Sequence, residues 1–177
     1  MNDATAPEFS RPVKVRPHPP EEMAVTADAG ERSALAKRFG VAAIDSLEAT
    51  ARFAPDGAAV DVIGTITADL VQTCAVAGDN FPVRIEEPFT VRFVPPTASA
   101  AQPDEEVELD EDDLDEIEFN GETIDLGEAV AQSLSLAIDP YAEGPNADAA
   151  RAEAGIEADD EPRDGPLADL LKGLKRD

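Results

Sequence analysis

The chain is poor in aromatic residues, in sulfur and in basic charge. Its 177 residues include no tryptophan, one tyrosine, one cysteine and one histidine, and 39 acidic residues against 14 basic ones give a net charge of −25. A lone cysteine excludes an intramolecular disulfide framework. The lone His18 lies in a proline-rich loop, and no second histidine completes a zinc site or serves as a base for Cys74. The sequence therefore predicts no enzyme, no catalytic or metal site and no cofactor.

The acidic charge also limits the classes of partner. It repels phosphate backbones, so broad salt-driven binding of nucleic acid is disfavoured, whereas a basic protein partner suits it. The N-terminal stretch MNDATAPEF has neither a basic start nor an apolar h-region. No apolar run approaches the roughly 20 residues needed to cross a bilayer. We therefore expect a cytoplasmic protein with no membrane partner.

Two helices are predicted by the same start signal. In each, an Asp at the N-cap is followed three residues later by a Glu whose carboxylate reaches back to the N–H of the cap. The first helix begins at Asp28 and ends at Gly40, which suits a left-handed C-cap. The second begins at Asp125, ends before Pro140 and carries an apolar face: Leu126, Val130, Leu134 and Ile138. Each helix is expected to pack one face on a sheet.

Alternation of apolar and polar residues predicts that sheet. Residues 47–53 and 60–70 form a hairpin, and residues 83–93 supply a third strand. Glu87 falls in the apolar phase beside Pro88, which predicts a bulge or an edge at that point.

A short fourth strand around Ile117 and Phe119, closed by Asn120-Gly121, is expected to complete an antiparallel sheet. The predicted fold class is therefore α+β: an antiparallel sheet, with curling toward a small barrel allowed, two packed helices and a disordered acidic tail.

The predicted folded domain covers residues 1–144, with an acidic loop at about 96–116. Residues 104–116 invite comparison with a calcium site. Counted as an EF-hand loop from Asp110, however, the glycine and glutamate positions hold Asp115 and Gly121. The segment is therefore interpreted as a solvated loop.

Residues 145–177 are predicted to be a disordered tail that ends in a short amphipathic helix. The helix carries leucines at helical spacing and places its cations at the C-terminal end. It either folds back on the body of the protein or docks on a partner. The predicted protein-docking residues are Leu167, Leu170, Leu171 and Leu174.

Three stretches follow one another along the chain: VDVIGTITADLVQTCAVAGDNFPVRIEEPFTVRFVP, TIDLGEAVAQSLSLAIDPYAEGP and the terminal GPLADLLKGLK. Together they resemble the YceD family, the large ribosomal RNA subunit accumulation proteins, in its alphaproteobacterial form. The resemblance spans most of residues 9–144 and recurs at the tail. It implies a non-enzymatic, cytoplasmic role in the synthesis, processing or stability of large-subunit ribosomal RNA. Genes of the family often neighbour that of a small basic large-subunit ribosomal protein.

The chain departs from the family pattern at the predicted hairpin, where Gly78-Asp79-Asn80 also replaces an expected Leu-Glu-Pro, and after Asp139-Pro140-Tyr141. Many members carry a C-x-x-C pair at the predicted hairpin tip, a metal knuckle, whereas Cys74-Ala75-Val76-Ala77 supplies one thiol. One thiol does not hold zinc tetrahedrally without other ligands, so Cys74 is interpreted as a relic or a hairpin-packing residue. A Pro-Arg pair common in the family is replaced by Ala142-Glu143.

Two hypotheses for function follow. In the first, the protein holds or delivers a basic large-subunit ribosomal protein or binds a pre-ribosomal particle, and its effect on ribosomal RNA is indirect. In the second, it is an RNA-contacting module with a local positive patch on the N-terminal segment and the sheet: Arg11, Lys14, Arg16, Arg84 and Arg92. The residues alone favour the first hypothesis because of the net charge, and both stay open here.

Overall fold

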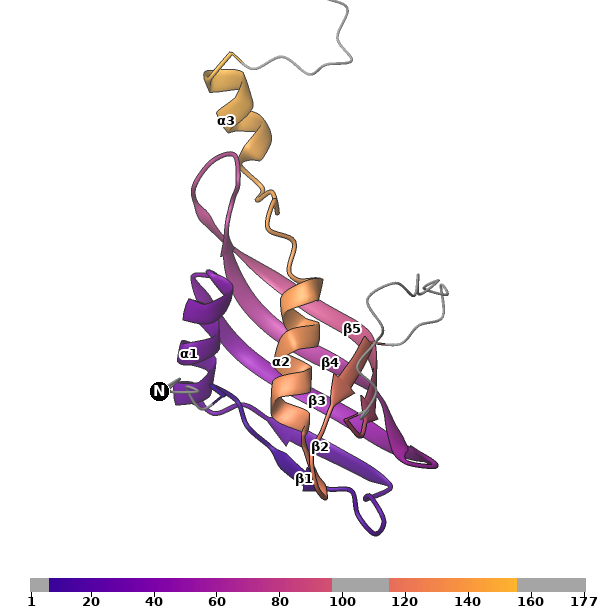
Figure 1. Ribbon diagram of the computed structural model, residues 1–177. Coiled ribbons are helices and arrows are strands. Elements are labelled where there is room, and N and C mark those ends of the chain that lie inside the picture. The colour runs from indigo at the N-terminus through magenta and orange to yellow at the C-terminus, as the bar shows by residue number, and fades with distance from the viewer. Residues whose placement is uncertain (1–6, 97–114, 156–177) are drawn as a thin grey trace, which may run out of the picture.

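The computed structural model describes residues 7–96 and 115–155. These residues form an α+β fold with one large sheet, a small second sheet and three helices (Figure 1). The elements are β1 (Pro12–Lys14), β2 (Glu22–Thr26), α1 (Ala29–Phe39), β3 (Ala43–Asp56), β4 (Ala59–Thr73), β5 (Asn80–Val94), β6 (Asp115–Glu118), β7 (Thr123–Asp125), α2 (Leu126–Ala137) and α3 (Ala147–Glu153).

The main sheet has the strand order β2-β3-β4-β5-β6. Its centre is the predicted set of three long strands, β3, β4 and β5, paired in antiparallel fashion. The expectation of an entirely antiparallel sheet is wrong at one edge, because β6 runs parallel to β5, with Val91 opposite Asp115 and Val94 opposite Glu118. The chain leaves β5 at Val94 and re-enters the sheet beside Val91, and this return fixes the parallel direction.

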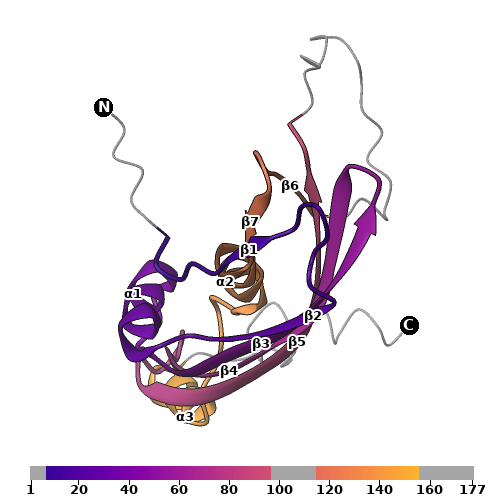
Figure 2. The ribbon, with the colours of Figure 1, turned by 90° about the horizontal axis from the view of Figure 1, so that it is seen from below.

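The sheet does not close into a barrel. Strands β2 and β6 lie at opposite ends of the strand order and do not pair with each other. Figure 2 shows the sheet bending around α1 and α2, which lie on its concave side. Because helices bury that face, apolar surface is covered without closure of the strands on themselves.

Of the two alternatives predicted at Glu87 and Pro88, a bulge or an edge, the structure shows the edge. The register between β4 and β5 is continuous there, with Ile66 opposite Glu87 and Thr65 opposite Pro88, so no bulge is present. In the described part of the chain β5 pairs with β6 only from Val91 onward, so Pro88 does lie at an edge. A residue without an N–H group is tolerated at such a position.

Helix α1 begins and ends as predicted. The Asp28 carboxylate accepts hydrogen bonds from the N–H groups of Gly30 and Glu31, and the Glu31 carboxylate accepts one from the N–H of Asp28. Gly40 has a φ of 70°, a left-handed conformation that costs glycine little. Local sequence therefore determines both ends of this helix.

Helix α2 has only half of the predicted capping box. Asp125 accepts a hydrogen bond from the N–H of Glu128, as expected. The Glu128 carboxylate does not return to the cap and instead pairs with Arg38 of α1. The Asp125 carboxylate also accepts bonds from the Ser10 hydroxyl at 2.6 Å and the Arg11 N–H at 2.8 Å. One carboxylate thus caps α2 and fixes the N-terminal segment to it.

The core lies between the concave face of the sheet and the two helices. The predicted apolar face of α2 is buried at Leu126, Val130 and Leu134, and α1 contributes Leu35. The sheet contributes alternate residues, including Leu47, Phe53, Val62, Ile66, Leu70, Ile85, Phe89 and Val91. Both helices therefore pack one face on the sheet, as predicted.

Four elements were not predicted. Strands β1 and β7 form the small sheet beside α2, and β2 adds an edge strand to the main sheet. Helix α3 lies within the range predicted as a tail, beyond the tip of the β4–β5 hairpin (Figure 1). The predicted acidic loop lies mostly outside the described residues, and the four tail leucines lie wholly outside them.

Candidate functional site

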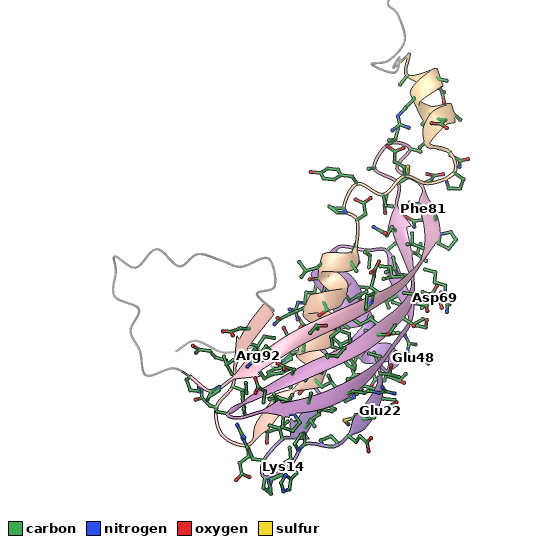
Figure 3. All side chains as sticks on the ribbon, turned by 90° about the vertical axis from the view of Figure 1, so that its right-hand side faces the viewer. Lys14, Glu22, Glu48, Asp69, Phe81 and Arg92 are labelled. Carbon is green, nitrogen blue, oxygen red and sulfur yellow. The ribbon has the colours of Figure 1, made fainter. Side chains whose placement is uncertain are left out.

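The cations proposed for an RNA-contacting patch lie on separate parts of the molecule. Lys14 is on β1, whereas Arg84 and Arg92 are eight residues apart on β5, about 26 Å at roughly 3.3 Å per residue. Figure 3 labels Lys14 and Arg92 near one end of the sheet, and Asp69, the partner of Arg84, farther along it. The structure therefore does not gather all of them on one small surface.

In the N-terminal segment these cations have carboxylate partners. The Arg11 guanidinium donates to both oxygens of Glu31, at 2.6 and 2.8 Å, and stacks on the ring of Phe9 at 4.6 Å. That hydrogen bond lowers the pKa of Glu31. Lys14 lies 3.1 Å from the carboxylate of Glu122. Glu31 and Glu122 thus largely neutralise the positive charges of Arg11 and Lys14.

The cations of β5 are paired in the same way. Arg84 donates to Asp69 at 2.9 Å. Arg92 lies between two carboxylates, 2.8 Å from Asp61 and 2.6 Å from Asp56. Phosphate groups would have to displace these internal partners, which costs binding energy.

Arg16 differs from the others. Its guanidinium donates to the carbonyl oxygens of Gly57 and Ala58 in the β3–β4 turn and lies 5.9 Å from the ring centre of Phe119. It is thus held by main-chain oxygen and an aromatic ring rather than by a carboxylate.

A further charged cluster joins the two packed helices. Arg38 of α1 donates to both oxygens of Glu128 of α2, at 2.8 and 2.9 Å, and to Glu8 at 3.0 Å. Hydrogen bonding by Arg38 lowers the pKa of Glu128 and keeps that carboxylate ionised. Sequence reasoning missed this cluster because Arg38 and Glu128 are 90 residues apart.

Cys74 is a packing residue at the hairpin tip. It is 2% exposed, and its Sγ accepts a hydrogen bond from the N–H of Ala77 at 3.2 Å, which lowers the pKa of the thiol. A Cβ placed on Gly144 would lie 3.4 Å from the Cβ of Cys74 and 2.8 Å from the ring of Phe81. The chain after α2 therefore lies closely on this hairpin, with Cys74 beneath it.

Residues 7–96 and 115–155 present neither a metal-binding cluster nor a membrane-spanning helix. No group of three or more His, Cys, Asp or Glu side chains there is placed to hold a metal ion. None of the helices in the same ranges is long and apolar enough to span a membrane.

A groove lies on the concave side of β5, next to the segment that follows α2. It has a volume of about 700 Å³. Its floor is apolar and contains Phe81, Val83, Ile85 and Ala137. The charged side chains along it are Glu86, Glu87, Asp139, Glu143 and Arg84, of which Glu143 is paired with Arg151 and Arg84 with Asp69. An apolar floor with acidic walls can bind a ligand that is both apolar and basic.

The opposite face of the main sheet carries no helix in the described structure. Glu48, Thr65 and Glu86 project from it as exposed side chains, and Ile63 is 53% exposed. Figure 3 shows the labelled Glu22, Glu48 and Asp69 along the strands of this sheet. Acidic and hydroxyl side chains share this surface with Arg52, Arg84 and Arg92, each of which is paired with a carboxylate.

Comparison with known proteins gives one match. A family model described as "Large ribosomal RNA subunit accumulation protein YceD" matches residues 62–174, which is more than half of the chain. The match begins in β4 and continues past α3. No curated protein and no solved structure matches the chain.

Proposed function

The chain belongs to the YceD family of large ribosomal RNA subunit accumulation proteins, and we propose on that premise that it supports the synthesis, processing or stability of large-subunit ribosomal RNA. It does so in the cytoplasm as a binding protein rather than as an enzyme. Its partner is a basic large-subunit ribosomal protein or a pre-ribosomal particle, and its effect on ribosomal RNA is indirect.

One observation carries this proposal: carboxylates of the same chain pair with four of the five cations of the predicted RNA-contacting patch, and the chain has a large excess of acidic residues. Arg11, Lys14, Arg84 and Arg92 each pair with a carboxylate of the same chain. The sequence as a whole has a net charge of −25. The negative electrostatic potential that this charge creates attracts a basic protein and repels naked RNA.

The mechanism follows from electrostatic competition. A basic ribosomal protein that is not yet assembled binds nucleic acid without specificity, because each phosphate contact releases counterions. An acidic carrier occupies that basic surface and shields it. Ribosomal RNA carries a denser line of negative charge, so it displaces the carrier at the assembly site. The carrier needs no base readout and no catalytic group.

The experiment compares two classes of ligand at physiological salt. Purified protein is mixed with the RNA-free protein fraction of large ribosomal subunits and, separately, with naked large-subunit ribosomal RNA. We expect retention of one or a few small basic proteins, lost at high salt, and no retention of the RNA.

The alternative RNA-contacting hypothesis gives the opposite result. It predicts that the RNA is retained and that replacing Lys14 and Arg16 by alanine weakens its binding and reduces the salt dependence. Binding of RNA that is as tight as binding of the basic proteins would overturn the proposed function. Replacement of the exposed Lys37 of α1, outside that patch, by alanine serves as the control for loss of a positive charge.

A further inference from the structure

Most of β5 has one free side. Its residues from Asn80 to Phe93 pair with β4 in an unbroken register. On the other side, within the described part of the chain, β6 covers only Val91–Val94. An edge of this kind presents main-chain donors and acceptors that are able to pair with another strand.

The direction of these groups follows from one hydrogen bond. The Val94 carbonyl accepts from the N–H of Phe119 at 2.9 Å, so the main-chain groups of Val94 point toward the edge. Alternate residues of a strand point the same way, and the register of β5 has no shift. Pro82 and Pro88 have the same parity as Val94, and a residue without an N–H group suits the free side of an edge strand.

The two prolines set the length of the free edge. Between them, Arg84 and Glu86 direct both N–H and C=O outward, and Pro82 and Pro88 each add a carbonyl oxygen. This stretch accommodates a strand of about five to seven residues at roughly 3.3 Å per residue. The prolines on either side limit longer pairing, which protects the edge from aggregation.

The side chains around the edge select the chemistry of the added strand. On the concave side lies the groove of about 700 Å³ with its floor of Phe81, Val83 and Ile85. Glu86, Glu87 and Asp139 are exposed, and in the described ranges none of them belongs to an ion pair. Because successive side chains of a strand point to opposite faces, the matching segment alternates apolar and basic residues.

We propose that the β5 edge between Pro82 and Pro88 binds an extended basic segment of a partner protein as an added strand. This inference rests on the proposed function, because it names the surface and the kind of segment through which a basic ribosomal protein is held. A second copy of the chain fits less well: antiparallel pairing about Ile85 would place Glu86 opposite Arg84, but each copy carries a net charge of −25 and the two copies would repel each other.

The first test uses a substitution that blocks the edge alone. Glu86→Pro removes an outward N–H at a position of the same parity as the natural prolines, so the pairing with β4 is kept. Glu86→Thr removes the same charge and keeps the N–H, which makes it the matched control. The probe is a synthetic ten-residue peptide of alternating valine and arginine; a peptide of alternating valine and glutamate is the negative control.

We expect the basic peptide to bind at physiological salt and the acidic peptide not to bind. Glu86→Pro should weaken binding about ten-fold or more, because hydrogen bonds of the added strand are lost. Glu86→Thr should weaken it only about two- to three-fold through the lost charge. Equal effects of the two substitutions would show that charge alone holds the peptide and would overturn the proposal.

Hydrogen exchange of the unmodified protein gives a second readout that does not depend on any variant folding. In the free protein the amides of Arg84 and Glu86 should exchange quickly, whereas those of Val83 and Ile85, which face β4, should be protected. Binding should protect Arg84 and Glu86. Protection already present in the free monomer would mean that another segment of this chain covers the edge, and protection that rises with protein concentration would mean a second copy. Either result overturns the proposal.

The same variants separate this inference from the proposed function. If the RNA-free large-subunit proteins bind equally well to the unmodified protein and to Glu86→Pro, the edge inference fails and the proposed function stands. If the peptide binds with the expected sensitivity and those proteins do not bind, the edge is confirmed and the proposed partner is wrong. Binding of naked RNA that Glu86→Pro abolishes would contradict the assignment of a protein segment.

Discussion

Replacing Gly64 by alanine tests how tightly the centre of the main sheet is packed. A Cβ at this position would lie 2.1 Å from the carbonyl oxygen of Thr50 and 2.6 Å from Cε1 of Phe89. Phe89 is 6% exposed and its ring is held in the core, so it has little room to withdraw. The Thr50 oxygen belongs to the backbone of β3, which pairs with β4 at this point. The clash between the added Cβ and the Thr50 oxygen is therefore relieved only if β3 and β4 move apart.

The magnitude follows from the kind of contact. Adding a methyl group to a well-packed core costs about 1–3 kcal/mol, and more when the backbone has to shift. Because one of the two short contacts is to backbone, we expect Gly64→Ala to lower the free energy of unfolding by about 3 kcal/mol. For a chain of this size that corresponds to a fall in Tm of roughly 6–12 °C.

Urea denaturation with linear extrapolation measures the effect. Thr65→Ala, at the next and exposed position of β4, is the control and should cost less than about 1 kcal/mol. In a Gly64→Ala, Phe89→Leu double variant the ring contact is relieved and the Thr50 contact is kept, so no full recovery is expected. A loss below about 1 kcal/mol for Gly64→Ala alone would refute the reasoning.

Three further predictions concern charge, metal and the tail. Because Arg38 lowers the folded-state pKa of Glu128, this pair stabilises the fold above the unfolded pKa of about 4.3 and ceases to do so as pH falls through the folded value; Glu128→Gln should therefore reduce the loss of stability measured between about pH 5 and pH 3. Zinc is not a structural requirement, so purified protein should contain no stoichiometric zinc and its melting curve should not change in chelator; the opposite result would contradict the packing role of Cys74. Removal of residues 165–177 should leave Tm nearly unchanged and impair association with pre-ribosomal particles; unchanged association or a clear fall in Tm would exclude a docking helix there.

The elements that sequence predicted well are those encoded by neighbouring residues. The two residues of the α1 capping box, Asp28 and Glu31, are three positions apart, and Gly40 signals the end of the same helix. The long strands β3, β4 and β5 show alternation over 14 or 15 residues each, which is a strong signal. Strands β1 and β7 have three residues each and offer no period to detect.

The misassigned features depend on distant partners. Glu128 has the spacing of a capping box, but Arg38, 90 residues away, competes for its carboxylate. The parallel direction of β6 depends on where the chain re-enters the sheet, and local sequence does not specify that point. For the candidate site, residue type correctly marked Arg84 and Arg92 as exposed-face cations of one strand. It could not show that Asp69 and Asp61, on β4, neutralise them.

The Asp125 carboxylate has a consequence for the order in which the protein folds as it is synthesised. Its partner Ser10 is 115 residues upstream, and β1 pairs with β7, the strand that ends at Asp125. Arg11 and Arg16 can contact α1 and the β3–β4 turn earlier, but β1 has no strand partner until β7 and α2 have been made, although the β3–β4–β5 meander is already complete. Contacts of such long sequence separation form late and slow the final step. During synthesis the apolar face of the β3–β4–β5 meander therefore stays exposed until α2 covers it. Chaperones can bind the nascent chain in this interval.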